Sequence, residues 1–300
     1  MPESDKAIIK TLLYSDIFNF PLTKEEVWRY LLSREPIEKA DFEQALQRLV
    51  SSEIYHKDGF YCLKGRAQCI EKRKKLIPQT EKKLRIARKA AYYLSYIPTV
   101  SFIGISGGLA LGNAQKDDDI DFFIITKPHT LFITRLWALA LLDFLQLRRK
   151  RGGKQSMNKI CINFLMDETR LLWPSGKRDI YIAHEIMQVR PLFERDGMYA
   201  KFLKANQWIR KLFPNMPKAI TFRGSSWYRE YYSLKVLHKL GTITFCEAIV
   251  RIIQKAYMKK HQTTEVISNS MLAFHPRDYH GQTLDMLKLR LQQYGLLTNK

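Results

Sequence analysis

Apolar side chains recur at helical spacing close to the N-terminus of the chain. They are Ile8, Ile9, Leu12, Leu13 and Ile17. This spacing predicts an amphipathic helix that ends before Pro21. Thr23 and Glu26 have the spacing of a capping box, in which each side chain bonds the backbone N–H of the other residue, so a second helix is predicted to begin there. A third helix is predicted from about Lys39, where apolar residues again recur every three or four positions.

Two short aromatic-rich runs follow, at residues 53–56 and 60–63, and Lys57-Asp58-Gly59 separates them. Asp-Gly between such runs is typical of a tight hairpin turn. Three short helices followed by a hairpin resemble a winged helix-turn-helix domain, here residues 1–65. The resemblance implies that the third helix reads DNA. The alternative is a domain that packs on protein, and the acidic residues within that helix favour it because they repel phosphates.

The central part of the chain alternates between apolar runs and turns. Val100–Ile105, Phe122–Thr126 and Ile160–Met166 predict buried strands. Leu131–Leu147 predicts a buried helix, because it carries charged residues and is shorter than the roughly 20 residues that cross a bilayer. We therefore expect no membrane insertion and an α+β fold whose central region has a small mixed sheet.

The pattern from about residue 218 onward is helical, with amphipathic stretches at Ile243–Met258 and Met286–Tyr294. The predicted organisation has four parts. They are a winged-helix-like domain of residues 1–65, a basic helical connector of residues 66–98, a central domain of residues 99–217 and a helical C-terminal region of residues 218–300.

Charge changes this picture mainly in the connector. The chain has 50 Lys and Arg against 29 Asp and Glu, a formal net charge of +21. Such an excess favours polyanionic partners such as nucleic acid or nucleotides, with a basic solvated surface as the alternative. Residues 64–89 are rich in Lys and Arg and contain only Glu71 and Glu81 as acids. The connector is therefore either a solvated helix face or a rim that contacts nucleic acid.

The cysteines and the N-terminus bear on the compartment. The four cysteines form no CxxC pair, so reduced thiols are expected rather than a disulfide framework or a zinc site. No basic segment leads into an apolar run at the N-terminus, which argues against a secretory signal. We expect a cytoplasmic protein.

The candidate chemistry lies between the first two central strands. Ser106, Gly107 and Gly108 follow the first strand, and adjacent glycines let backbone amides approach a phosphate. Asp119 and Asp121 are two residues apart at the start of the second strand, so their side chains leave the same face. A divalent cation relieves the repulsion between two such carboxylates, and oxygen ligands suit Mg²⁺ or Mn²⁺.

The segment GISGGLALGNAQKDDDIDFFII, residues 104–125, resembles the signature of the nucleotidyltransferase superfamily with the polymerase-β-like fold. The resemblance implies that Asp119 and Asp121 are catalytic metal ligands and that Ser106, Gly107 and Gly108 bind the phosphates of an NTP. It also implies transfer of a nucleoside monophosphate to an acceptor. The usual turn has a serine where this chain has Gly108, which removes one phosphate hydrogen bond.

The family usually supplies a third carboxylate from a later strand, and the expected strand has none. Alternation places Cys161, Asn163 and Leu165 on one face and Ile162 and Phe164 on the other. Asn163 is the polar candidate on the first face, and Asp167 lies just past the strand. Either the enzyme works with two carboxylates and a base from elsewhere, or the site binds nucleotide without turnover.

Other readings stay open at this point. His184 and Glu185 are neighbours that form either an acid/base pair or part of a helix surface. The alternative to an enzyme is a nucleotide-sensing regulator that binds nucleic acid or protein, and a third reading is a toxin that modifies tRNA or protein. The sequence leaves the acceptor unknown.

Overall fold

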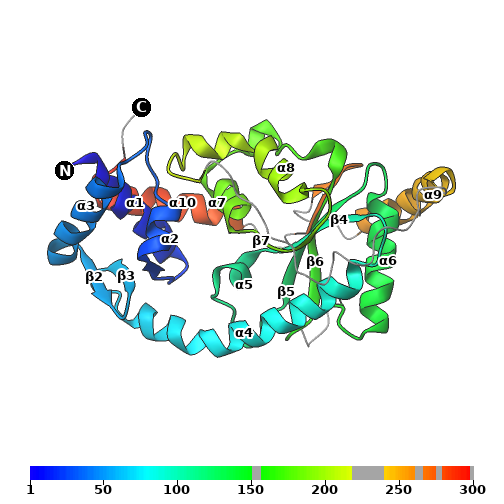
Figure 1. The fold of residues 1–300 in the computed structure, drawn as a ribbon, viewed down its shortest axis with the longest axis horizontal. Helices are drawn as coiled ribbons and strands as arrows, with labels where there is room; N and C mark the ends of the chain where they lie inside the picture. The colour runs from blue at the N-terminus through cyan, green and yellow to red at the C-terminus, as the bar shows by residue number, and fades with distance from the viewer. Residues whose placement is uncertain (151–156, 218–239, 261–265, 275–278, 298–300) are drawn as a thin grey trace.

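The computed structural model describes residues 1–150, 157–217, 240–260, 266–274 and 279–297 (Figure 1). The chain has an α+β fold, as expected, with helices on both sides of a mixed sheet. In the described residues no helix is long and apolar enough to cross a membrane.

The N-terminal region combines three helices with a small antiparallel sheet of order β1-β3-β2. Its elements are α1 (Glu3–Ile17), β1 (Leu22–Thr23), α2 (Lys24–Arg29), α3 (Lys39–Ser52), β2 (Ile54–Lys57) and β3 (Phe60–Leu63). The capping box is present: the Glu26 N–H donates to Thr23 Oγ1 at 3.2 Å, and the Thr23 N–H donates to Glu26 Oε2 at 2.9 Å. The strand β1 was not predicted, because two residues are too few to show a period.

The connector is one long helix, α4 (Gln68–Leu94), which runs from the N-terminal region to the central sheet (Figure 1). Its C-terminal half buries an apolar face formed by Leu84, Ala87, Ala90, Ala91 and Leu94. The helix therefore joins the hydrophobic core on one side and leaves the other side to solvent.

The central sheet has the order β7-β4-β5-β6-β9-β8. Its strands are β4 (Val100–Ile105), β5 (Ile120–Thr126), β6 (Ile160–Asp167), β7 (Arg190–Glu194), β8 (Val266–Ile267) and β9 (Met271–Ala273). Only β5 and β6 pair in parallel. The helix α6 (Leu131–Phe144) makes the crossover between them, as a parallel connection requires.

The expectation of a purely helical C-terminal region is wrong in one respect. Residues 218–239 lie outside the described residues, and α9 (Leu240–Lys259) and α10 (Tyr279–Gln293) match the expected amphipathic stretches. Between them, however, β8 and β9 extend the central sheet at its β6 edge. Strands of two and three residues are stabilised by the edge they join and carry no period of their own.

The two faces of the sheet differ in their coverage. One face packs against α4, α6 and α9 around residues such as Phe122, Ile124 and Phe132. The other face packs against the helices of residues 180–211 around Phe123 and Phe164. These are α7 (Ile180–Gln188), α8 (Met198–Ala205) and the 3-10 helix Gln207–Lys211; two further 3-10 turns, Glu168–Arg170 and Ser175–Lys177, precede them.

The N-terminal region docks on this second face through α7. The Tyr14 ring of α1 stacks on His184, with ring centroids 3.7 Å apart. Arg29 donates to the Met187 carbonyl at 3.1 Å. Helix α10 lies beside α1, and its Arg290 bonds Asp16. The two regions therefore share a hydrophobic core, and α10 runs from that junction to the central sheet.

Candidate functional site

Two carboxylates and a thiol gather at the start of β5. Oxygen atoms of Asp119 and Asp121 and the sulfur of Cys161 lie within 4.8 Å of one another, close enough to hold one metal ion. Asp119 immediately precedes β5, and Asp121 is its second residue, paired in register with Cys161 on β6. The structure thus brings Asp119 and Asp121 together as the sequence predicted.

The glycine turn lies directly against this cluster. Gly107 begins the one-turn helix α5 (Gly107–Leu111) with a φ of 62°. A Cβ on Gly107 would lie 3.1 Å from Asp121 Oδ2, tighter than most such contacts. The Ser106 N–H donates to the Asp121 carbonyl at 3.1 Å. Gly107 is therefore needed both for its left-handed backbone and for its closeness to the Asp121 carboxylate.

A buried lysine of α4 holds the acidic loop of residues 116–119, which precedes β5. Lys83 of α4 has no exposed surface, and its ammonium group donates to the carbonyls of Lys116 and Asp118 and to Asn158 Oδ1. Burial lowers the pKa of Lys83. The expectation that the basic residues of the connector face solvent or nucleic acid is therefore wrong for Lys83, which fixes the loop that carries Asp119.

A second cation contacts the cluster from the other side. Arg149 donates to Asp119 Oδ2 at 2.6 Å and lies 3.8 Å from the Cys161 sulfur. This pairing occupies one oxygen of Asp119 and leaves the other available to a metal. Burial, together with the nearby Asp119 charge, raises the pKa of Asp121 to about 8. A bound cation would favour the ionised form of Asp121, since carboxylates coordinate metals when deprotonated.

The strand β6 departs from the alternation that the sequence predicted. Phe122 pairs with Ile162 and Phe123 pairs with Phe164, so Asn163 is an extra residue in a β-bulge. Asn163 and Phe164 consequently both line the same pocket. Phe164 thus lies on the face expected for Asn163, and Leu165 joins the opposite core, because the bulge shifts the alternation by one residue.

Cys161, rather than Asn163, therefore occupies the position beside the two aspartates. Asn163 was the predicted ligand because its amide oxygen can bind a metal. Strand register instead decides which side chain lies beside Asp121, and Cys161 is the residue that pairs with it. Burial raises the pKa of Cys161 to about 12, so its sulfur is a neutral thiol at physiological pH.

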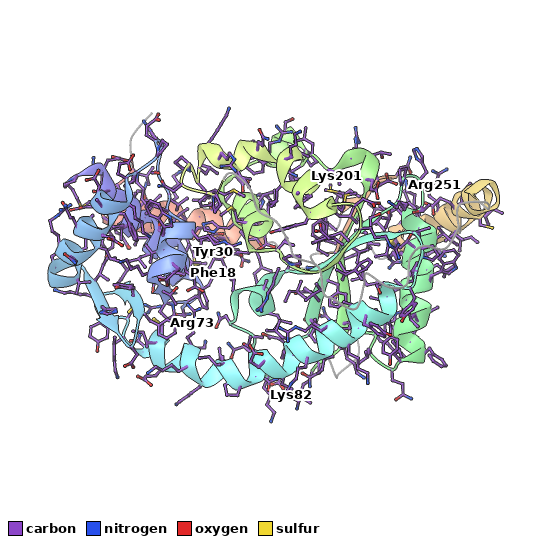
Figure 2. The ribbon with its side chains drawn as sticks, viewed as in Figure 1. Phe18, Tyr30, Arg73, Lys82, Lys201 and Arg251 are labelled. Atoms are coloured by element: carbon purple, nitrogen blue, oxygen red, sulfur yellow. The ribbon has the colours of Figure 1, made fainter. Side chains whose placement is uncertain are left out.

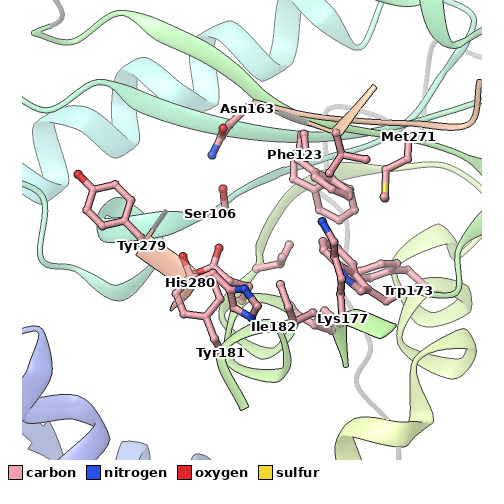
Figure 3. A pocket seen from close by; sticks show the side chains of 17 residues that line it. Ser106, Phe123, Asn163, Trp173, Lys177, Tyr181, Ile182, Met271, Tyr279 and His280 are labelled. Atoms are coloured by element: carbon pink, nitrogen blue, oxygen red, sulfur yellow. The ribbon is translucent and has the colours of Figure 1, made fainter. Parts of the chain in front are cut away.

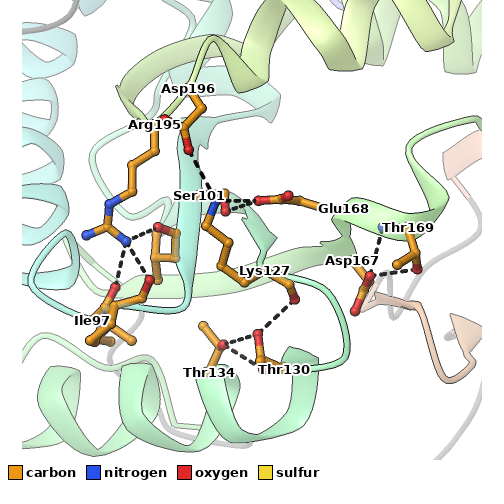
Figure 4. A network of polar contacts seen from close by, with 12 residues as sticks. Ile97, Ser101, Lys127, Thr130, Thr134, Asp167, Glu168, Thr169, Arg195 and Asp196 are labelled. Atoms are coloured by element: carbon orange, nitrogen blue, oxygen red, sulfur yellow. Dashed lines mark hydrogen bonds and ion pairs between the residues drawn. The ribbon is translucent and has the colours of Figure 1, made fainter. Parts of the chain in front are cut away.

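Asp167 lies at the far end of β6, paired with Thr126 at the last position of β5. Its carboxylate is buried and accepts from the His129 N–H at 2.7 Å, from the Thr169 N–H at 2.8 Å and from the Thr169 hydroxyl at 2.7 Å. Figure 4 shows it beside the Lys127 and Glu168 contacts. Asp167 is therefore remote from Asp119 and Asp121 and caps a turn, contrary to its proposed place in the site.

A pocket opens beside the cluster, between the second face of the sheet, α7 and the start of α10 (Figure 3). Its volume is about 160 Å³. The polar residues that line it include Ser106, Asn163, Lys177, Tyr181, Glu185, Tyr279 and His280, and the apolar ones include Phe123, Phe164, Trp173, Ile182 and Met271. His280 pairs with Asp179 at 2.5 Å, which ties α10 to the start of α7.

The neighbours His184 and Glu185 occupy different environments. They therefore form neither an acid/base pair nor part of an exposed helix surface. His184 is buried under Tyr14, and burial lowers its pKa to about 3. Glu185 lines the pocket, and burial raises its pKa to about 7. Sequence reasoning could have separated them by helical phase, because adjacent residues in a helix point about 100° apart.

The donor set suits a hard divalent cation held by few protein ligands. Mg²⁺ is usually held by one or two carboxylates and completes its shell with water and substrate phosphates. Asp119 and Asp121 meet that requirement, and the neutral Cys161 thiol would not bind such a cation. A softer metal such as Zn²⁺ would recruit the sulfur as a thiolate.

Comparison with known proteins adds no relative: no protein-family model, no curated protein and no solved structure matches the chain.

Proposed function

We propose that the protein is a cytoplasmic nucleotidyltransferase that moves a nucleoside monophosphate from an NTP to an acceptor. The observation that carries the proposal is the convergence of the Asp119 and Asp121 carboxylates against the left-handed Gly107 turn. Acidic residues that face a glycine turn across one strand end are the parts that metal-assisted phosphoryl chemistry requires.

Each residue has a defined task in this proposal. Asp119 and Asp121 hold Mg²⁺ or Mn²⁺, which when bound neutralises charge on the triphosphate during in-line attack. The backbone of Ser106, Gly107 and Gly108 approaches the phosphates. Lys83 keeps the acidic loop in place through its three acceptors.

Arg149 gives the site a cation before metal arrives. It pairs with Asp119 at 2.6 Å and its side chain is 40% exposed, so it can turn to a phosphate when a metal takes its place. The alternative reading, a nucleotide sensor without turnover, uses the same binding residues and lacks only an acceptor and a base.

Thermal unfolding tests the binding step. Mg²⁺ and ATP together, at about 100 times their dissociation constant, should raise the melting temperature by roughly 5 °C, because ligands that bind only the folded state stabilise it. Asp119→Asn with Asp121→Asn should abolish this shift. Asp117→Asn, an exposed acid of the same loop, is the matched control and should retain it. An equal shift in the double variant and the wild type would refute the proposed site.

Nucleic acid is a second candidate ligand because of the surface of α4. Lys72, Lys75, Lys82, Arg85, Arg88 and Lys89 are exposed, and none contacts a carboxylate among the described residues. Arg73 is different: it holds both carboxylate oxygens of Glu26, at 2.6 and 2.7 Å, at the junction with the N-terminal region. Figure 2 shows Lys82 on the outer side of α4, away from the sheet.

This basic stripe makes a salt-dependence prediction. Replacing Lys75, Lys82, Arg85 and Lys89 by Gln should flatten the plot of log K against log[salt] for duplex binding by about 3.6 units, at roughly 0.9 per phosphate contact. Lys201→Gln with Lys204→Gln, both exposed on α8, is the control; Figure 2 shows Lys201 away from α4. Equal slopes in all three proteins would show that the stripe is only solvated.

The N-terminal region supports a winged-helix-like domain used for packing. The cations of α3 are already engaged, since Lys39 lies over the Trp28 ring at 4.3 Å and Arg48 pairs with Asp5 at 2.8 Å. Its contacts with α7 and α10 favour a role within the molecule over reading a DNA groove.

A further inference from the structure

We propose that the pocket between α7, α10 and the second face of the sheet binds the acceptor, a neutral alcohol about the size of one ring, and that the Glu185 carboxylate takes the proton of its hydroxyl. This inference rests on the proposed function and names the substrate class and the base that the two aspartates leave unassigned.

The pocket lies next to the proposed phosphate site. Ser106 lines it and also bonds the Asp121 backbone at 3.1 Å. The pocket therefore begins where the proposed phosphate cradle ends. A hydroxyl held there would lie next to the phosphates that we propose to bind at Ser106, Gly107 and Gly108.

Glu185 is the candidate base in this pocket. Its side chain is half-buried and lines the pocket, and burial raises the pKa of its carboxyl group. Among the described residues no hydrogen-bond donor or cation contacts it. A half-buried carboxylate without a partner is poorly solvated, and a donating hydroxyl in the pocket would offset that cost. A pKa near 7 also suits a group that must accept a proton at neutral pH.

The dimensions and the charges of the pocket define the acceptor. A volume of about 160 Å³ is close to that of cavities that hold one benzene-sized ring. Phe123, Phe164 and Ile182 supply apolar walls. Lys177 lines the same pocket, and the whole chain carries a net charge of +21. Lys177 disfavours a cationic amine and the Glu185 carboxylate disfavours an anion, which leaves a neutral alcohol or phenol.

The transfer step balances without any further reactant. The acceptor oxygen forms a bond to the α-phosphorus of the NTP while the bond from that phosphorus to the β-phosphate bridging oxygen breaks. Pyrophosphate leaves with the electron pair of the broken bond. The hydroxyl proton passes to Glu185 and then to water.

Phenol serves as the probe. Wild-type protein should bind phenol saturably in ligand-observed NMR without metal or nucleotide, and Ala273→Leu, which narrows the pocket, should weaken this binding at least tenfold. Asp119→Asn with Asp121→Asn should leave it unchanged. Absence of phenol binding, or displacement of phenol by MgATP, which would mean that the pocket holds the base of the nucleotide, would overturn the inference.

Transfer to phenol tests Glu185 itself by mass spectrometry of the nucleotidylated product. Glu185→Gln should bind MgATP like the wild type and transfer about 10²–10⁴-fold more slowly, the usual contribution of a general base. Glu194→Gln is the control; Glu194 also has a pKa raised by burial but bonds the Tyr199 N–H away from the pocket, and this variant should transfer within twofold of wild type. Undiminished transfer by Glu185→Gln, or phenol binding by a wild type that binds MgATP and transfers nothing, overturns the inference. Wild-type protein that binds phenol and fails to bind MgATP instead contradicts the proposed function.

Discussion

The two faces of the central sheet treat buried charge in opposite ways. On the face covered by α4, α6 and α9, Lys83 has three oxygen acceptors, and the Glu247 carboxylate accepts the N–H groups of Phe132 and Ile133 at 3.0 and 2.7 Å. On the α7 face, Glu185 has no donor among the described residues, and the His184 Nε2 atom has no partner there either. Within the part of the chain that the structure describes, the first face thus bonds Lys83 and Glu247, although Arg135 Nε of α6 has no partner there, and the second face leaves Glu185 and His184 Nε2 without one.

This difference separates stability from function within one sheet. A satisfied buried ion stabilises the fold as long as its partners remain, whereas an unsatisfied one destabilises the fold until a ligand completes it. The face covered by α4, α6 and α9, called the closed face below, thus fixes the acidic loop, and the α7 face carries the groups that we propose to bind the acceptor. Substitutions on the two faces should therefore change the free energy of unfolding with opposite signs.

The largest effect is expected at Lys83. Lys83→Met keeps the length of the side chain and removes the ammonium group, which leaves the carbonyls of Lys116 and Asp118 unpaired. We expect a loss of about 3 kcal/mol in the free energy of unfolding, measured by urea denaturation. Lys82→Met, at the adjacent exposed position, is the matched control and should change it by less than about 0.5 kcal/mol. Similar values for the two variants would contradict the assigned role of Lys83.

His184 should make the molecule sensitive to acid. Its pKa is lowered to about 3 in the folded state, against about 6.5 when unfolded. As the pH falls, the unfolded state therefore binds a proton before the folded state does. The contribution of neutral His184 to the free energy of unfolding is complete above pH 6.5 and is lost as the pH falls toward 3. His184→Phe keeps a ring against Tyr14 and should gain about 2 kcal/mol relative to wild type between pH 7.5 and pH 5. A difference between the two proteins that stays constant with pH would show that His184 does not titrate in this way.

Glu185 has the reverse linkage. Its folded pKa of about 7 lies above the ordinary glutamate value of 4.5, so the carboxylate costs stability as the pH rises from 4.5 through 7. Glu185→Gln should therefore gain about 1–2 kcal/mol at pH 8, after allowance for its partial contact with solvent. Burial raises the pKa of Glu247 as well, but the N–H groups of Ile133 and Phe132 oppose that effect. Glu247→Gln, on the closed face, should lose about 1 kcal/mol because these bonds to the α6 N-terminus weaken. Changes of the same sign in both variants would remove the distinction between the faces.

The sequence predicted the parts of the molecule that rest on local patterns. The capping box at Thr23, the strands on either side of the glycine turn and the closeness of Asp119 to Asp121 all follow from short-range spacing. The parts that failed depend on long-range partners. A one-residue bulge at Asn163 decided which side chain lies beside Asp121, and the edge of β6 decided that residues 266–273 form strands. Helical phase could have placed Lys83 on the buried face with Ala87 and Ala90 and Lys82 off it, but the loop whose carbonyls Lys83 binds is a long-range partner.

The smallest expected effect concerns Cys161, where the α7 face meets the metal cluster. Cys161→Ser replaces the sulfur with a harder oxygen and leaves both aspartates in place. Mg²⁺ affinity, measured by calorimetry in the presence of ATP, should change by less than about threefold, because a neutral thiol contributes little to a hard cation. Zn²⁺ affinity should fall by about tenfold or more, since Zn²⁺ would otherwise deprotonate and bind the sulfur. A large loss of Mg²⁺ affinity would mean that the residue at position 161 takes a direct part in the magnesium site, which would replace the two-carboxylate description given above.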